Sequence, residues 1–255
     1  MRKIPLTKDR RFRIDVRMRL SARILMAPVF FCLFFQPGCL FRKHQAPAAP
    51  TLPARVSIVL LPLNVPQENA DLRWLPFAGT VLMATEVQAA PDLDTVPLWS
   101  SVPAVLQALG TSRTITSDIA ASTATRMSAK WATQGDIMPA KTNFTLRLDF
   151  IPSESIPYPY RYQKEGSVDA LESRIQEAIS QFLNYLIVRP LMPTKVQKLD
   201  AQKLKAIAQA LDAEYGWYVP ARPGEAVKEV EDLARTNRDL ARLLFNPALY
   251  PVLAK

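Results

Sequence analysis

The chain has few of the residues that carry most enzyme chemistry. It contains two cysteines and one histidine among 255 residues. Cys32 and Cys39 lie near the amino terminus, and the histidine is His44, so every later residue is of another type. The body of the chain can therefore form no internal disulfide, no Cys/His zinc site and no Ser-His-Asp or Cys-His arrangement. We expect a non-enzyme without metal or cofactor.

Carboxylates are the remaining candidates for chemistry, either for glycoside cleavage or for binding of a hard metal ion. They are scattered along the body, at Glu68, Asp71, Glu86, Asp92, Asp94, Asp136 and Asp149. Each is more simply interpreted as a turn, cap or solvated side chain. An enzyme that uses carboxylates or a hidden cofactor therefore stays an alternative.

Glycine is also scarce, at seven residues, whereas 49% of the chain is apolar and the mean hydropathy is near zero. Eleven Phe, seven Tyr and four Trp supply material for a core. This composition argues against a disordered chain, a collagen-like chain and a polytopic membrane protein. The length suits one or two globular units.

The net charge of +9 comes from the amino-terminal segment alone. Residues 1–43 hold 11 of the 32 basic residues and two of the 23 acidic residues, which leaves 21 of each sign for the rest. A balanced body has little electrostatic drive to bind DNA or RNA. We expect no nucleic-acid partner.

The amino-terminal segment has the pattern of an export signal. Residues 24–35, ILMAPVFFCLFF, form an apolar run, and Arg17, Arg19 and Arg23 precede it. Twelve helical residues span about 18 Å, against a hydrocarbon core of about 30 Å. The run therefore favours a signal peptide over a transmembrane helix.

The pair Gly38-Cys39 follows this run and resembles the bacterial lipobox, in which the signal is cut before a cysteine that becomes lipidated. Gln36 stands where that pattern prefers leucine. Residues 42–54, RKHQAPAAPTLPA, suit an extended tether. Because Leu40 is not Asp, we expect an outer-membrane lipoprotein that faces the periplasm.

Alternatives for this segment remain open. An ordinary secretory signal could be cut near Gly38 or Ala46, or the segment could stay uncleaved, with Cys39 an incidental thiol. Counting from Met18 instead of Met1 gives a more compact charged region before the apolar run.

Patterning of the body predicts a mixed α/β fold. An apolar run and helical spacings predict, in order, a strand over 55–65, a helix over 75–89, a strand over 95–100, a helix over 102–109 and a helix from 117. Strict alternation in 143–151 predicts a strand with one buried face, paired with a strand over 131–138.

The remaining pattern is mainly helical. A third antiparallel strand near 158–163 leads to a long helix over 168–188, expected to pack across the sheet. Helical spacings over 199–214 and 225–245 predict a carboxy-terminal helical hairpin. The fold class is thus α/β (α+β), a mixed β-sheet packed by helices and followed by that hairpin.

Two short motifs resemble the TolB amino-terminal and CsgG-type superfamily. The first is Leu60-Leu61-Pro62-Leu63 in the opening strand, and the second combines Ala129 with Gly135 and Ile137. The resemblance covers about residues 55–188 and supplies no catalytic residue. It implies a protein-binding domain, as a homo-oligomer or as an accessory of an envelope secretion, export or wall-synthesis system.

We therefore divide the chain into a leader (1–38), a lipidated cysteine and tether (39–54), an α/β domain (55–192) and a helical hairpin (193–255). The predicted partners are the membrane, through the lipid anchor, and envelope proteins, including further copies of the chain. A periplasmic domain that senses a ligand or signal is the main alternative function.

Six aromatic residues and one arginine would suit protein contacts if their side chains are exposed. They are Arg73, Trp74, Tyr158, Tyr160, Tyr162, Trp217 and Tyr218. The alternating tyrosines are expected to share a strand face, and the last two residues to lie in a loop. Tyr and Trp are enriched at interfaces, but the same residues could instead fill the rim of the core or form a carbohydrate platform.

Overall fold

The computed structural model describes residues 55–66, 68, 70–90, 92–140, 143–154, 158–186 and 199–254. The predicted signal, Cys39 and the tether lie outside these ranges. Residues 51–255 form one compact unit. Within the described ranges, no helix is both long enough and apolar enough to cross a bilayer.

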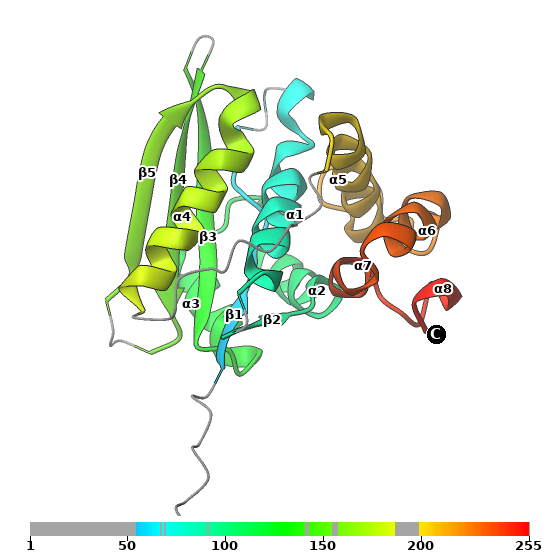
Figure 1. Ribbon diagram of the computed structural model, residues 1–255, viewed down its shortest axis with the longest axis horizontal. Helices are drawn as coiled ribbons and strands as arrows, with labels where there is room; N and C mark the ends of the chain where they lie inside the picture. Colours follow the sequence, from blue (N-terminus) through cyan, green and yellow to red (C-terminus); the bar gives the residue numbers. More distant parts are fainter. Residues whose placement is uncertain are drawn as a thin grey trace, which may run out of the picture. The chain divides into compact units, whose positions relative to one another are not determined.

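A five-stranded mixed sheet is the centre of the fold, in the order β2-β1-β3-β4-β5 (Figure 1). The strands are β1 (Val56–Val59), β2 (Leu93–Val96), β3 (Trp131–Ala140), β4 (Asn143–Pro152) and β5 (Tyr160–Gly166). β1 is parallel to β2 and β3, whereas β3, β4 and β5 are antiparallel. The predicted α/β class is confirmed.

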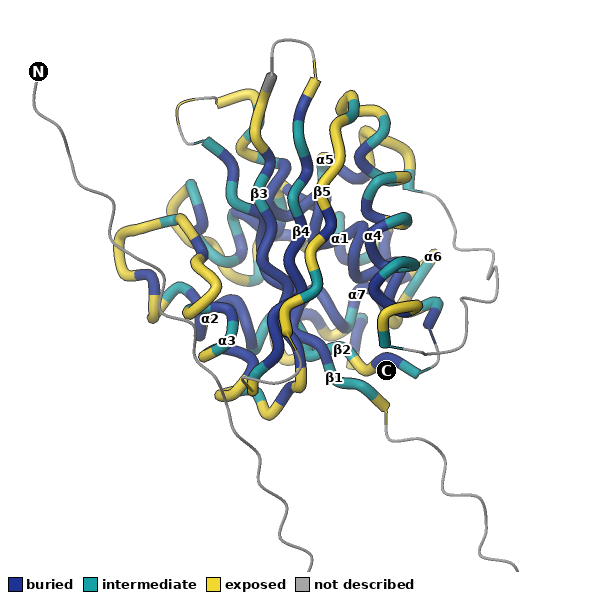
Figure 2. The backbone as a smooth tube through the Cα atoms, turned by 90° about the vertical axis from the view of Figure 1, so that its left-hand side faces the viewer, coloured by how far each residue is buried: buried dark blue, intermediate teal, exposed yellow. Residues whose placement is uncertain are grey.

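Helices cover the two faces of this sheet unequally. They are α1 (Leu75–Gln88), α2 (Leu98–Leu109), α3 (Ser117–Arg126), α4 (Leu171–Tyr185), α5 (Ala201–Tyr215), α6 (Val227–Thr236), α7 (Arg238–Leu244) and α8 (Pro251–Ala254), with short 3-10 turns at Ala70–Leu72 and Val168–Ala170. α1 packs beside α4 on one face, and α5 packs on α1. In Figure 2, α2 and α3 lie on the other side of the strands, so most of the β4 and β5 face there is left open.

The two sequence motifs meet in the core. Leu63 is fully buried between Gly79 of α1 and Gly135 of β3. A Cβ atom would lie 2.2 Å from Leu63 Cδ1 at Gly79 and 2.4 Å from Leu63 Cδ2 at Gly135. The backbone of Asn64 donates to Gly135 O (2.7 Å) and accepts from the Ile137 N–H (2.8 Å). The glycine in β3 therefore makes room for the leucine that follows β1.

The structure corrects the predicted strand over 95–100. β2 ends at Val96, and Leu98, Trp99 and Ser100 form the first turn of α2 with Pro97 as its N-cap. The Ser100 hydroxyl donates to Pro97 O (2.8 Å), and Trp99 Nε1 donates to Arg242 O of α7 (3.2 Å). The second bond joins residues 143 positions apart, so a local pattern could not reveal it.

The second helix of the predicted hairpin is also interrupted. Asn237 has φ −149° and ψ 88°, between α6 and α7, and its side chain accepts from the Leu240 N–H (2.9 Å). Asn237 thus ends one helix and caps the next. These carboxy-terminal helices pack on α1 and α2.

Candidate interaction surface

The open face of β4 and β5 carries a row of polar side chains. Alternation places Arg147 and Asp149 of β4 on the face away from α4, because Leu146, Leu148 and Phe150 point into the core. In the strand register, Asp149 lies opposite Arg161 of β5. The adjacent strands β4 and β5 therefore bring Asp149, Arg147 and Arg161 together on this face.

Asp149 is the centre of this group. Its side chain is 1% exposed, and its carboxylate accepts hydrogen bonds from Arg147 Nη2 (2.6 Å) and Arg161 Nε (2.7 Å). The side chains of Arg147 and Arg161 are 31% and 59% exposed. The buried Asp149 therefore holds the two guanidinium groups in fixed orientations at the surface. Because they are already ordered, binding a partner would cost little side-chain entropy.

A second acid continues the polar face toward β3. Asp136 accepts hydrogen bonds from Asn64 Nδ2 (2.8 Å) and Gln134 Nε2 (3.2 Å). The same Asn64 amide donates to Ile115 O (2.9 Å), and its oxygen accepts from the Ile115 N–H (2.7 Å). These bonds attach the loop before α3 to the sheet and give the face a defined shape.

On the opposite face of the sheet, Glu177 of α4 binds side chains of β5. It accepts hydrogen bonds from the Tyr162 hydroxyl (2.8 Å) and from Lys164, and Arg174 and Gln181 also donate to it (3.3 and 3.1 Å). The hydrogen bond from Lys164, followed by that from Tyr162, lowers the pKa of Glu177. β5 is thus held against α4 by an ionised carboxylate.

The three predicted tyrosines occupy different environments. Tyr158 precedes β5 and is 79% exposed, whereas Tyr162 is 3% exposed and contributes to the core. Tyr160 is half-buried and donates to Gln181 Oε1 (3.0 Å). Of the three, Tyr158 presents the largest surface to solvent.

The other predicted aromatic pair lies at the end of α5. Trp217 is 1% exposed and contacts Phe77 edge-on, with ring centroids 6.0 Å apart. Arg113 Nε donates to Trp217 O (2.6 Å). Tyr218 is half-buried, and its backbone N–H donates to Asp212 Oδ1 (2.7 Å).

Arg73 and Trp74 lie at the start of α1. Trp74 is half-buried, with Lys205 Nζ 6.0 Å from its ring centroid. Arg73 is exposed, and its charge acts on the carboxyl of Asp212. Burial nevertheless outweighs this charge and the bonds from the loop backbone, and it raises the pKa of Asp212. Arg73 and Tyr218 thus act on one acid, although they are far apart in the sequence.

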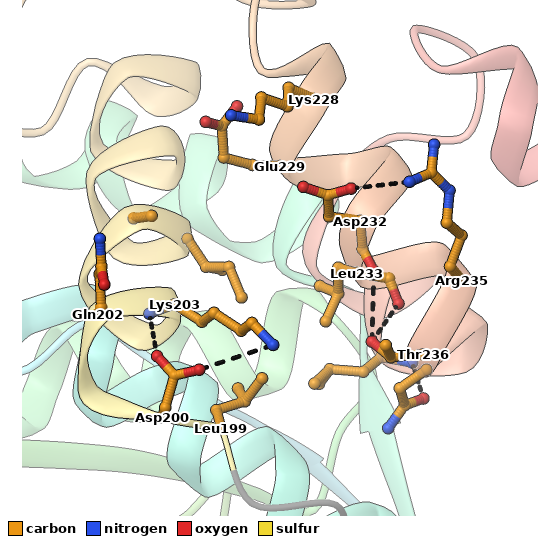
Figure 3. A pocket seen from close by; sticks show the side chains of 14 residues that line it. Leu199, Asp200, Gln202, Lys203, Lys228, Glu229, Asp232, Leu233, Arg235 and Thr236 are labelled. Atoms are coloured by element: carbon orange, nitrogen blue, oxygen red, sulfur yellow. Dashed lines mark hydrogen bonds and ion pairs between the residues drawn. The ribbon is translucent and has the colours of Figure 1, made fainter.

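A groove of about 550 Å³ lies between α5 and the α6–α7 pair (Figure 3). Its apolar lining includes Leu199, Ile207, Leu233 and Leu240. Charged residues line the rest, and Figure 3 shows Lys203 turned toward Asp200 and Arg235 toward Asp232. Acids and bases are equal in number there, so the groove carries no excess charge.

Acidic clusters that could hold a metal ion are absent from the described ranges, in which no group of three or more His, Cys, Asp or Glu residues has a suitable arrangement. Two buried acids bind neighbouring parts of the chain. Glu214 accepts from the Tyr250 hydroxyl (2.6 Å) and the Gly224 N–H (2.9 Å), and Asp212 holds the loop at Tyr218.

Sequence reasoning missed the arginines of the open face and Glu177. The sequence alone predicts a turn, cap or solvated side chain for Asp149, because its partner Arg161 is twelve positions away and the pairing depends on strand register. The available signal was the alternation of Arg147 and Asp149 in a strand with one apolar face. The predicted lipidation site, Cys39, lies outside the described residues.

No family model matches the chain, and no curated protein matches it. Solved structures give weak likenesses. The LpoB C-terminal domain from Salmonella enterica has a TM-score of 0.34 and 13% identity, over 47% of this chain and 87% of that one. A PelC dodecamer from Paraburkholderia phytofirmans has a TM-score of 0.31 and 13% identity, over 56% and 96%.

LpoB from E. coli, determined by NMR, has a TM-score of 0.33 and 13% identity, over 65% of this chain and 94% of that chain. At these TM-scores, neither the fold nor the function of this chain follows from the similarity. The resemblance to the TolB amino-terminal and CsgG-type superfamily stays a prediction.

Proposed function

We propose that this protein is a lipid-anchored component of the bacterial cell envelope. Its α/β domain binds other proteins of an envelope secretion, export or wall-synthesis system and catalyses no reaction. The protein faces the periplasm, and the outer membrane is the favoured location. The resemblance of the two core motifs to the TolB amino-terminal and CsgG-type superfamily supports this role.

The observation that carries the proposal is the order of features around Cys39. A charged segment, a twelve-residue apolar run, Gly38-Cys39 and a Pro/Ala-rich stretch precede the folded unit. Acyl chains on Cys39 would hold the protein on a membrane, since stable anchoring needs at least two lipid signals. The stretch over 42–54 would then let the domain reach partners away from the bilayer.

The open face supports binding as the domain's role. Arginine is enriched at protein interfaces, and binding is favoured when side chains are ordered beforehand. Arg147 and Arg161 meet both conditions, because Asp149 orders them while leaving them partly exposed. Such a face suits a partner that presents carboxylates or backbone carbonyl groups.

A ligand-sensing domain is the second candidate function, and the groove between α5 and α6 favours it. Its volume of about 550 Å³ falls within the range of small-molecule pockets, about 300–1,000 Å³. Filling the groove with Ala206→Trp would abolish binding of a small molecule there and leave the open face unchanged. Ligand-induced shifts of melting temperature, compared between this variant and the unchanged chain, test the candidate.

Membrane fractionation tests the anchor. The full chain is expressed in a Gram-negative host, beside Cys39→Ala and the matched control Cys32→Ala. We expect the unchanged chain and Cys32→Ala in the membrane fraction and release of Cys39→Ala from it. Equal distribution of all three would overturn the lipoprotein proposal.

Crosslinking in living cells tests the binding role. A photo-reactive residue at Thr145, on the open face, is compared with one at Gln209, an exposed position on α5. We expect adducts with a distinct envelope protein from Thr145 and much weaker ones from Gln209. Equal adduct yields at both positions would contradict a binding role for the open face.

A further inference from the structure

β5 is an edge of the sheet. It pairs with β4 on one side, and on its other side no backbone group bonds to any part of the chain that the structure describes. Figure 2 looks onto this edge, which runs along the front of the sheet beside β4. A free strand edge can pair with another strand through its unpaired N–H and C=O groups.

We propose that β5 binds β5 of a second copy of this chain, as an antiparallel pair with its two-fold axis at Gln163. In this register, Arg161 of one copy lies opposite Glu165 of the other, and the symmetry repeats the pair on the other side of the axis. Both side chains lie on the open face and are exposed. Opposite charges in directly facing positions stabilise a strand pair.

The charges on β5 favour the axis at Gln163 over an axis at any neighbouring residue. Residues that face each other in an antiparallel pair lie on the same face of the sheet. The two-fold axis must therefore pass at a residue of β5 and not between two residues. An axis at Arg161, Lys164 or Glu165 places like charges directly opposite each other, which is unfavourable. An axis at Tyr162 forms no pair of opposite charges. The axis at Gln163 forms two such pairs and no like-charge pair.

An exposed apolar residue lies near each end of β5. Tyr158 is 79% exposed before β5, and Val168 is 43% exposed after it. The two are equally distant in sequence from Gln163, so the antiparallel pair brings Tyr158 of one copy to the end that carries Val168 of the other. Contact there would remove both side chains from water, which accounts for their exposure in the single chain.

The geometry of Arg161 suits a contact between copies. Its Nε and Nη2 atoms donate to Asp149 (2.7 and 3.1 Å). Nη1 has no hydrogen bond to a described residue, so a carboxylate of the second copy can accept from it without displacing Asp149. Because Asp149 already orients the guanidinium, pairing with Glu165 of the second copy costs little side-chain entropy.

Pairing through β5 is a property of the folded unit and does not depend on lipidation of Cys39. A second copy of the chain is thus one partner of the domain. Arg161 belongs to both the open face and the β5 edge, but the two proposals name different partners: a second copy of the chain at the edge, and a distinct envelope protein at Thr145 of β4. Loss of self-association therefore would not remove the crosslinking expected at Thr145, and the two proposals fail separately.

Disulfide crosslinking tests the register directly. In the full chain with Cys32→Ser and Cys39→Ser, kept in detergent, Gln163→Cys places a single thiol at the axis. Facing Cβ atoms in a strand pair lie near disulfide reach. Compared with Gln209→Cys on α5, we expect about tenfold faster formation of a disulfide dimer, because pairing raises the local thiol concentration.

Two further variants identify the facing residues. Arg161→Cys and Glu165→Cys face each other and not themselves, so each should crosslink weakly alone and rapidly when the two proteins are mixed. Efficient crosslinking of either variant with itself, or equal rates for Gln163→Cys and Gln209→Cys, would overturn the proposal.

A charge reversal gives a readout without cysteine. Glu165→Lys turns both attractive pairs into repulsive ones and should raise the dimer dissociation constant about tenfold or more. Sedimentation measures this constant, and circular dichroism checks that the fold is unchanged. A monomer at all concentrations, a ring larger than a dimer, or an unaltered dissociation constant in Glu165→Lys would refute the antiparallel pair.

Discussion

The contact between Leu63 and Gly135 allows the clearest test of the core. In Gly135→Ala, the new Cβ atom would lie 2.4 Å from Leu63 Cδ2 and 3.2 Å from Arg147 O. Leu63 cannot move toward α1, because its Cδ1 atom already lies 2.2 Å from the position that a Cβ atom would take at Gly79. The methyl group therefore forces a shift of packed atoms on both sides of the leucine.

Overpacking of this kind costs about 1–3 kcal/mol. We expect Gly135→Ala to lower the free energy of unfolding by about 2 kcal/mol, which corresponds to a fall of about 4–8 °C in melting temperature for a unit of this size. Urea denaturation followed by circular dichroism measures the change. Gly166→Ala is the matched control, because its Cβ would meet its nearest atoms at an ordinary 3.4 Å.

A double variant separates this clash from other effects of alanine. Leu63→Ala alone should cost about 2–5 kcal/mol through the cavity that it leaves. Adding Gly135→Ala to it should cost almost nothing further, because the new methyl group occupies part of that cavity. Strict additivity of the two changes, or a neutral Gly135→Ala, would refute the packing argument.

Three other predictions concern buried acids. Asp149→Asn should lower the free energy of unfolding by about 2 kcal/mol in urea denaturation, because two arginines lose their counter-charge; a change below about 0.5 kcal/mol would contradict the reading. Burial raises the pKa of Asp212, so the unchanged chain should lose stability as the pH rises from the ordinary Asp value through this raised value. Asp212→Asn should lack that loss, and parallel curves from pH 3.5 to 7 for both proteins would contradict it. Tyr250→Phe removes the hydroxyl that binds buried Glu214 and should cost about 1–3 kcal/mol, measured in the same way; unchanged stability would show that the bond contributes nothing.

Local patterns predicted much of the fold. The alternation in 143–151 predicted β4 and its buried face, and the helix expected over 75–89 is α1 (Leu75–Gln88). The helix expected from 117 begins at Ser117, where the Thr116 side chain caps it. These elements could be predicted because the residues that determine them lie close together in the sequence.

Elements set by distant contacts could not be predicted in this way. α2 begins at Leu98 within a β-rich sequence, and its Trp99 bonds to α7. The break at Asn237 interrupts an otherwise continuous helical spacing. The candidate surface also depends on a distant contact. Asp149 meets Arg161 only because the register of β4 and β5 places them opposite each other.

The mass of the mature protein tests the central claim most directly. The membrane-bound form, purified after expression in a Gram-negative host, is measured intact by mass spectrometry. The proposal predicts a chain that begins at Cys39 and carries acyl groups on it. A chain that begins at any other residue, or that carries an unmodified Cys39, would contradict the proposal that the protein is a lipid-anchored component of the envelope.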